Sequence, residues 1–131
     1  MERNSYTILL VDDNFDNVEL LAEMLQAQGY CTLNALNGHD AIKMAANEHP
    51  DLILLDIAMP VMDGLEVLDV LKSDGATAKI PVMFVTGIMQ NKQIARALER
   101  DVVDYIAKPF AIPDVIEKID RYLKRSSGKK I

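Results

Sequence analysis

Four short apolar runs recur along the chain, and each is followed directly by a polar side chain. Each run is uncharged and bounded by charged or turn residues, which is the pattern of a buried strand. A fifth segment, Tyr30 to Ala35, is half polar and predicts a strand at the edge of a sheet. The four apolar runs are Ile8–Val11, Leu52–Leu55, Val82–Val85 and Tyr105–Ala107, and the polar residues after them are Asp12-Asp13, Asp56, Thr86 and Lys108.

Between these runs, apolar residues return at the spacing of helices that bury one face. Gly29 is expected to end the first helix, and the second should stop before Pro50. Strands and helices alternate five times, which predicts an α/β fold with a parallel sheet, helices on both faces and right-handed crossovers. The apolar helix positions are Val18, Leu21, Ala22, Met24 and Leu25; Ala41, Ile42, Ala45 and Ala46; Leu65, Val67, Leu68 and Leu71; Ile94, Ala95, Ala97 and Leu98; and Val115, Ile116, Ile119, Tyr122 and Leu123.

The connections and the chain length predict a single domain. Asn37-Gly38 is expected to form a turn, and Asp63-Gly64 a turn that leads into the third helix. With 131 residues the chain has the usual size of one domain, which we place at residues 1–125. The polar segment 126–131 is expected to be a frayed terminus or the start of a linker. The domain is expected either to stand alone or to be part of a longer protein.

The polar residues at the strand ends should gather at one edge of the sheet. In an open parallel sheet, ligands bind beyond the carboxyl ends of the strands. Asp12, Asp13 and Asp56 would then lie close together, and like charges at short range need a cation or a shared proton. A divalent ion with oxygen ligands, such as Mg²⁺, is the simplest remedy. The combination of carboxylates, the Thr86 hydroxyl and the Lys108 ammonium predicts a metal and phosphoryl site.

Each of these residues, taken alone, has a plainer interpretation. Asp13 or Asn14 could cap the first helix, because short polar side chains are favoured at that position. A threonine at a strand end is commonly a cap, and a lysine after a strand is more often solvated than functional. The methionines are expected to fill the core. The combination of residues, rather than any one of them, favours the functional interpretation.

Composition narrows the classes of partner. The formal net charge of −6 disfavours direct binding to nucleic acid or to an anionic membrane, because phosphate groups select for positive charge. The single Cys31 cannot form an internal disulfide, which agrees with a reducing cytoplasm. No apolar run is long enough to span a bilayer, and the first residues lack the pattern of a signal peptide.

Four motifs resemble the receiver domain of two-component response regulators. The resemblance extends from about Thr7 to Lys124 and implies a doubly wound, flavodoxin-like (βα)5 domain with strand order 2-1-3-4-5. One departure is Asp101-Val102, where the family commonly has Gly-Ala. The motifs are Val11-Asp12-Asp13-Asn14, the run from Asp56 to Gly64, Val85-Thr86-Gly87, and the run from Asp104 to Phe110.

The resemblance implies a role for each matching residue. Asp56 would accept the phosphoryl group, and Mg²⁺, with Mn²⁺ as a substitute, would be held by Asp12, Asp13, Asp56 and the backbone carbonyl of Ala58. The other implied roles are a switch hydroxyl at Thr86, a switch aromatic at Tyr105, a phosphate-binding lysine at Lys108 and a cis peptide bond before Pro109.

The resemblance also implies the partners. The donor would be a sensor histidine kinase or a histidine phosphotransfer protein. The output domain or downstream protein would bind the face formed by the fourth helix, the fifth strand and the fifth helix, and phosphorylation could drive formation of a homodimer. The chain is therefore expected to be a phosphoaccepting signalling switch rather than an enzyme, with the cytoplasm as its compartment.

Three other function classes fit the sequence less well. A phosphatase of the haloacid dehalogenase type also forms an aspartyl phosphate, but it needs a second aspartate two residues after the nucleophile, where this chain has Ala58. A pseudo-receiver, which binds partners without phosphorylation, usually lacks a member of the site, and none is missing here. Flavin binding would need a phosphate-cradling loop of glycine, serine or threonine after the first strand, which is not present.

Two positions predict the lifetime of the signal. Hydrolysis of an aspartyl phosphate needs a water molecule held in line with the phosphorus, and polar side chains two residues after Asp56 or after Thr86 could hold it. These positions are Ala58 and Ile88, neither of which can position water. We therefore expect a long-lived phosphoryl form, suited to slow responses or to a phosphorelay.

Overall fold

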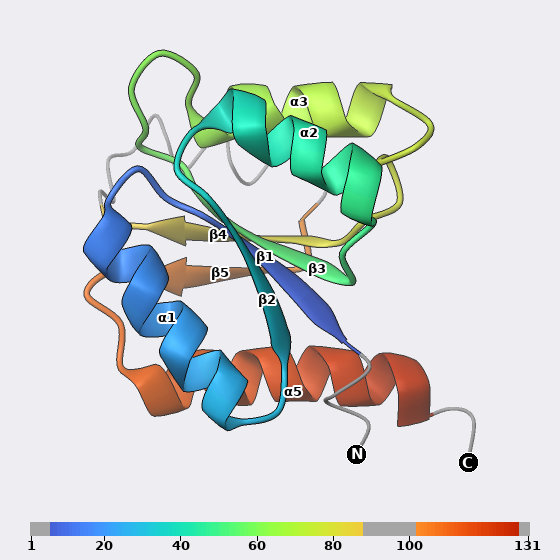
Figure 1. The fold of residues 1–131 in the computed structure, drawn as a ribbon. Coiled ribbons are helices and arrows are strands. Elements are labelled where there is room, and N and C mark those ends of the chain that lie inside the picture. Colours follow the sequence, from blue (N-terminus) through green and yellow to red (C-terminus); the bar gives the residue numbers. More distant parts are fainter. Residues whose placement is uncertain (1–5, 88–101, 129–131) are drawn as a thin grey trace.

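The computed structural model describes residues 6–87 and 102–128, and it consists of a five-stranded parallel sheet between two layers of helices (Figure 1). The sheet order is β2-β1-β3-β4-β5, which confirms the predicted fold and the edge position of the half-polar strand. The strands are β1 (Thr7–Val11), β2 (Cys31–Ala35), β3 (Leu52–Asp56), β4 (Val82–Thr86) and β5 (Asp104–Ala107), and the helices are α1 (Phe15–Ala27), α2 (Gly38–Glu48), α3 (Gly64–Ser73) and α5 (Ile112–Gly128). The predicted fourth helix, around Ile94–Leu98, lies outside the described residues.

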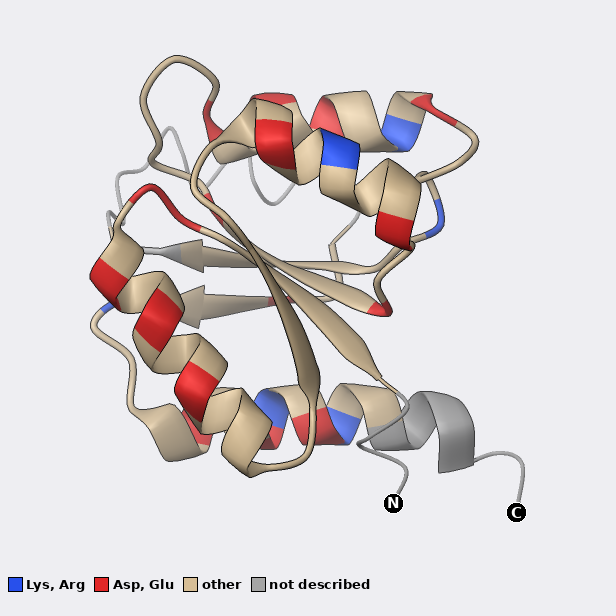
Figure 2. Ribbon diagram, viewed as in Figure 1, with Lys and Arg blue, Asp and Glu red and all other residues tan. Residues whose placement is uncertain are grey.

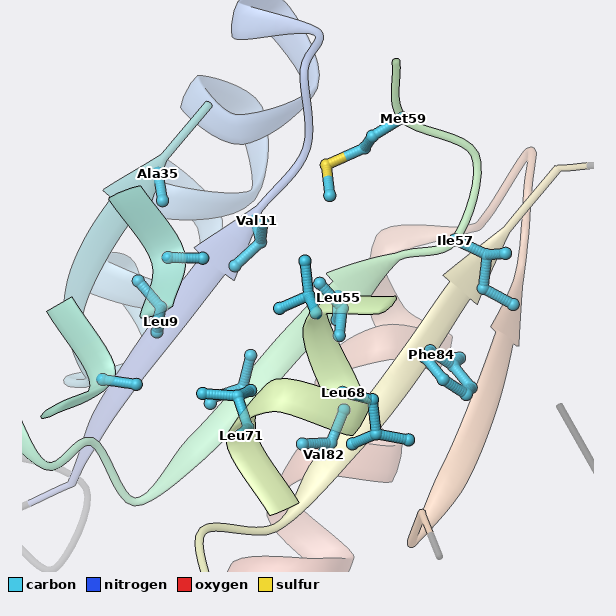
Figure 3. Close-up of a cluster of buried hydrophobic side chains, with 14 of the residues drawn as sticks. Leu9, Val11, Ala35, Leu55, Ile57, Met59, Leu68, Leu71, Val82 and Phe84 are labelled. Atoms are coloured by element: carbon cyan, nitrogen blue, oxygen red, sulfur yellow. The ribbon is translucent and has the colours of Figure 1, made fainter. Parts of the chain in front are cut away.

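Each face of the sheet packs against two of the helices that the structure describes. Successive side chains of a strand point to opposite faces, so Leu9 and Ile53 join one apolar cluster and Ile8 and Leu52 the other. Helices α2 and α3 cover the first face, and α1 and α5 cover the second (Figure 1). Figure 3 shows the first cluster, in which Phe84 of β4 is fully buried. Because the three central strands β1, β3 and β4 are covered on both faces, their sequences are almost continuously apolar, whereas β5 lies at an edge and is only partly buried.

Short polar side chains begin helices α1, α2 and α3. Asn14 and Asn37 each accept a hydrogen bond from the backbone amide three residues ahead, at 3.1 Å and 2.8 Å. Asp63 and Glu66 form a capping box at the start of α3. The predicted turn at Asn37-Gly38 is therefore wrong in kind, because Asn37 is the N-cap of α2 and the following glycine is its first residue.

The ends of α1 and α2 follow the sequence pattern. Gly29 follows α1 with a φ of 98°, a conformation that glycine adopts without strain, and α2 ends before Pro50 as expected. Met24 is 37% exposed, so it is not one of the buried positions of α1. Helix α5 extends to Gly128, into the predicted tail, and the domain boundary at residue 125 stays a prediction. No helix within the described ranges is long and apolar enough to cross a membrane.

Candidate functional site

Asp12 and Asp56 lie at the carboxyl ends of neighbouring central strands. Residues Val11 and Leu55 are partners in the β1–β3 register, so the aspartates that follow them emerge side by side. Asp12 is 5% exposed and its carboxylate accepts hydrogen bonds from the Asn14 amide at 2.9 Å and from the Asn17 side chain at 3.3 Å. These bonds hold the carboxylate in place at the beginning of α1.

Asp56 is 3% exposed and closes β3. Its Oδ1 atom accepts a hydrogen bond of 3.2 Å from the Ala58 amide, so the loop after β3 turns directly over the carboxylate. Gly64 makes this turn possible, because a Cβ atom at that position would lie 2.4 Å from the Asp56 carbonyl oxygen. The sequence indicated a turn at Asp63-Gly64, but the need for a glycine to let α3 approach the end of β3 became evident only in the structure.

Asp13 completes a cluster of three carboxylates. Ligand oxygens of Asp12, Asp13 and Asp56 lie within 4.8 Å of one another. Asp13 is exposed, whereas the other two carboxylates are buried. The cluster therefore has one open side through which an ion or a phosphoryl group could enter.

Lys108 bridges the two buried carboxylates. It follows β5, and its Nζ atom donates to Asp12 Oδ2 at 2.8 Å and to Asp56 Oδ2 at 3.3 Å. The Lys108 side chain is 21% exposed, against 8% for Asp12 and 4% for Asp56. The peptide bond from Lys108 to Pro109 is cis, which confirms the prediction made for it.

The charges of the site shift three pKa values. Burial, together with the neighbouring Asp12 charge, raises the pKa of Asp56 from 3.8 to about 6, against the opposing effect of Lys108. Burial also acts to raise the pKa of Asp12. The hydrogen bonds that Asp12 accepts from Lys108, Asn14 and Asn17, with the Lys108 charge, outweigh burial, so the pKa of Asp12 is lowered. Burial acts to lower the pKa of Lys108, and the two carboxylates reverse this and raise it.

The donor set fits a hard divalent cation. All three side chains supply carboxylate oxygen, the ligand type that Mg²⁺ and Mn²⁺ prefer. Burial and the Asp12 charge together raise the pKa of Asp56 in spite of Lys108, and a bound cation would favour its ionised form. The carboxylate cluster predicted from the strand ends is thus present, and it could hold a metal ion.

The structure describes the other predicted site residues only in part. Thr86 ends β4 opposite Ala107 of β5, but its side chain is not among those described. Tyr105 is half-buried, with its ring centroid 6.2 Å from that of Phe84 and tilted by 35°. The Ala58 backbone lies at the site through its amide, and Ile88 lies outside the described residues.

Sequence reasoning missed Asn17. Its side-chain amide donates to Asp12, one helical turn after the capping residue Asn14. A polar side chain at this position of α1 carries no sequence signal that distinguishes it from an ordinary solvated residue. Only the folded structure relates it to the carboxylate cluster.

Comparisons with known proteins agree with this geometry. The family model described as "Response regulator receiver domain" matches residues 8–120. The polar-differentiation response regulator DivK of Brucella ovis is 38% identical over 117 residues, which cover 89% of this chain and 95% of that protein. A CheY-like response regulator receiver domain from Methanospirillum hungatei has a TM-score of 0.86 and 27% identity, covering 95% of this chain and 98% of that chain. The signal receiver domain of a histidine kinase from Syntrophus aciditrophicus has a TM-score of 0.84 and 32% identity, covering 91% and 90%.

The match extends over most of the chain and includes the strand ends that carry the acidic cluster. Such a domain is a signalling phosphoacceptor of a two-component system rather than an enzyme, and a histidine kinase is the partner that it implies. With the five parallel strands in the order 2-1-3-4-5 and the acidic cluster at their carboxyl ends, this chain belongs to the response regulator receiver domain family.

Proposed function

We propose that Asp56 accepts a phosphoryl group from a phosphohistidine and that this event changes the surface presented to a downstream partner. The observation that carries the proposal is the arrangement of Asp12, Asp13, Asp56 and Lys108 at the carboxyl ends of the strands. The family supplies the class of reaction. The geometry supports the assignment of roles to residues.

The transfer is a displacement at phosphorus. An oxygen of the Asp56 carboxylate attacks the phosphorus atom, an O–P bond forms and the P–N bond of the phosphohistidine breaks. The electron pair of that bond returns to the imidazole nitrogen, which then leaves as the neutral ring after a proton is taken up. The pKa of Asp56 at about 6 leaves the carboxylate ionised at pH 7 and more basic than an exposed aspartate.

Positive charge is the main requirement of this reaction, because charge develops on the phosphoryl oxygens. Lys108 lies 3.3 Å from Asp56 and can supply one ammonium to the incoming group. Asp12, Asp13, Asp56 and the Ala58 carbonyl would hold Mg²⁺, or Mn²⁺ in its place, which when bound supplies further positive charge to the phosphoryl oxygens. The Asn14 and Asn17 hydrogen bonds keep Asp12 oriented for this task.

The response would pass from the site to β5. Thr86 and Ala107 are register partners, as are Phe84 and Tyr105, so the switch positions lie on paired strands. Tyr105 is half-buried, so its exposure can change in either direction. In our proposal the Thr86 hydroxyl binds the new phosphoryl group and Tyr105 turns inward, which alters the face formed by the predicted fourth helix, β5 and α5. This face would bind the output protein or a second copy of the chain.

The donor would be a sensor histidine kinase or a histidine phosphotransfer protein. A hollow of about 450 Å³ adjoins Lys108 and is lined by Asn17, Leu20, Gly87, Pro109 and Phe110 as well as by Lys108 itself. Its position leaves room for a donor side chain beside Lys108, which contacts the two buried carboxylates. This access supports transfer from another protein rather than from a deeply enclosed cofactor.

The lifetime of the phosphoryl group would depend on Ala58 and Ile88. Neither side chain can hold a hydrolytic water, and loss of such positioning typically slows a reaction by a factor of about 10². We expect the phosphoryl group to be lost slowly from the wild type and faster from the double mutant Ala58→Asn/Ile88→Glu. The measurement is the loss of the phosphoryl group over time after the donor is removed. A double mutant that decays no faster would show that these positions do not set the lifetime.

The assignment of Asp56 is tested by intact mass. Incubation with acetyl phosphate and Mg²⁺ should add one phosphoryl group to the wild type and none to Asp56→Ala. Asp13→Ala is the matched metal-site variant, and it should abolish most of the Mg²⁺-dependent rise in melting temperature while remaining folded, since Asp13 is exposed. Equal Mg²⁺ effects in wild type and Asp13→Ala would remove Asp13 from the ligand set.

A further inference from the structure

Three residues at the start of α1 are joined in a closed set of hydrogen bonds. Asp12 Oδ1 accepts from the Asn14 backbone amide at 2.9 Å, and Asn14 Oδ1 accepts from the Asn17 backbone amide at 3.1 Å. The Asn17 side chain closes the set, because its Nδ2 atom donates to Asp12 Oδ2 at 3.3 Å. The N-cap of α1 therefore fixes the backbone of Asn17 and holds its side-chain amide against the carboxylate.

The Oδ2 atom of Asp12 accepts two hydrogen bonds of different kinds. Lys108 donates to this oxygen as an ammonium at 2.8 Å, and Asn17 donates to the same oxygen as a neutral amide. The Lys108 ammonium also donates to Asp56 Oδ2, at the longer distance of 3.3 Å. Lys108 is thus held more closely by Asp12 than by Asp56, which is the phosphoacceptor in the proposed function.

The proposed transfer requires Lys108 to leave Asp12. Its ammonium is to bind the phosphoryl oxygens at Asp56, and these bonds take the place of its bond to Asp12. Asp12 is 5% exposed, so bulk water has little access to the oxygen that Lys108 vacates. A buried carboxylate oxygen that loses its donor is costly, and this cost opposes the movement of Lys108. Asn17 reduces the cost by remaining on that oxygen.

The Asn17 amide is neutral, which suits a residue beside a metal site. Helix α1 contains no lysine or arginine, and Figure 2 shows acidic positions along it. A cation at position 17 would compensate the charge of Asp12 and oppose binding of a metal ion, whereas an amide binds the carboxylate and leaves its charge in place. Asn17 is half-buried and borders the hollow of about 450 Å³ that Lys108 also lines, so Lys108 has open space next to this amide.

We propose that Asn17 is a positioning residue that holds Asp12 Oδ2 while Lys108 moves from Asp12 to the phosphoryl group. Asn17 acts through Asp12 and Lys108 and does not itself touch the phosphoryl group. The inference rests on the proposed function, because it takes Asp56 to accept the phosphoryl group and Lys108 to bind it. Asn17 then matters most in the state in which Lys108 no longer occupies Asp12.

A double-mutant cycle without metal tests whether Asn17 and Lys108 share one oxygen. The urea midpoints of wild type, Asn17→Leu, Lys108→Met and the double variant are measured in EDTA at pH 8. Leucine has the branched shape of asparagine without its amide. Asn17→Leu should lower the midpoint by a small amount while Lys108 occupies the oxygen, and by more in Lys108→Met, in which no ammonium remains there.

The rate of phosphorylation by phosphoramidate tests the movement of Lys108. At saturating Mg²⁺ the Asn17→Leu and Asn17→Ala variants should be phosphorylated about tenfold more slowly than the wild type, the effect of losing one hydrogen bond to a charged group. Agreement between the two variants excludes crowding by leucine as the cause. A residue that only orients a metal ligand would instead raise the Mg²⁺ concentration that is needed and leave the maximal rate unchanged.

The matched control is Asn47→Ala, which removes an exposed asparagine from α2. It should keep the maximal rate and the Mg²⁺ dependence of the wild type, and its midpoint shift should be the same with and without Lys108→Met.

Two results would overturn the inference. Equal midpoint shifts for Asn17→Leu in both backgrounds would show that Asn17 and Lys108 do not act on a shared oxygen. A wild-type maximal rate in both Asn17 variants would show that Lys108 leaves Asp12 without help, and this result decides the matter if Lys108→Met fails to fold. Failure of phosphoramidate to label the wild type would refute the proposed function instead, whereas the cycle in EDTA does not depend on phosphorylation.

Discussion

Replacing Asp56 with asparagine should make the metal-free protein more stable at neutral pH. The substitution keeps the shape of the side chain and removes the charge that burial and Asp12 oppose. The pKa of Asp56 in the folded state is about 6, above its ordinary value of 3.8. An acid with a raised pKa contributes stability that is fully present below pH 3.8 and is lost as the pH rises through 6.

The magnitude follows from these two values. The difference between 3.8 and about 6 corresponds to ~3 kcal/mol, at about 1.36 kcal/mol for each pH unit. The Asp56 side chain is only 4% exposed, so solvent screens this effect weakly. We therefore expect Asp56→Asn to exceed the wild type by up to ~3 kcal/mol at pH 8 and by little at pH 4.

Urea unfolding measures this directly. Wild type and Asp56→Asn are unfolded at several pH values between 4 and 8 in the presence of EDTA, and the free energies of unfolding are compared. The wild type should lose stability relative to the variant mainly between pH 4 and 6.5. Addition of Mg²⁺ at pH 8 should narrow the gap, because the ion compensates the charge that asparagine lacks. Parallel curves for the two proteins across the whole pH range would refute the reasoning.

Three further substitutions test neighbouring parts of the site. Lys108→Met removes the ammonium that bridges two buried carboxylates, so the free energy of unfolding of the metal-free variant, measured in urea, should fall by at least about 2 kcal/mol. Mg²⁺ should then stabilise the variant more than the wild type, and a smaller Mg²⁺ effect would contradict the pairing. Gly64→Ala places a Cβ atom 2.4 Å from the Asp56 carbonyl oxygen and should lower the free energy of unfolding by about 3 kcal/mol. An unchanged urea midpoint would argue against this close approach. Val61 has a φ of 68°, which is strained for a valine, so Val61→Gly should raise the melting temperature and add about 1 kcal/mol to the free energy of unfolding. A lower melting temperature would show that the valine stabilises the free domain.

Much of the sheet could be predicted because each buried strand has an uninterrupted apolar sequence that ends at a polar residue. Asp12 and Asp56 mark the ends of β1 and β3, so the strand boundaries predicted that both carboxylates lie at the same edge of a parallel sheet. The strand order did not follow from the alternation of elements, and it came from the resemblance to receiver domains. The acidic cluster thus required only that the strands be parallel and adjacent.

Other features depend on distances that no local pattern contains. Asn37-Gly38 has the same sequence signal whether it forms a turn or caps a helix, and the packing of α2 decides between the two. Lys108 pairs with Asp12 across 96 residues, and its charge could equally have been solvated. The strain at Val61 arises from the hydrogen bond between its two neighbours, which the composition of the loop does not reveal.

The central claim is that Asp56 is the phosphoacceptor, and mass spectrometry of the labelled protein tests it most directly. Wild type and Asp56→Asn are incubated with phosphoramidate and Mg²⁺, the intact masses are measured, and the labelled residue is located by peptide mapping after borohydride reduction of the acyl phosphate. The account predicts one added phosphoryl group in the wild type, located at Asp56, and none in the variant. A phosphoryl group of equal amount in Asp56→Asn, or one located at Asp12 or Asp13 in the wild type, would contradict it.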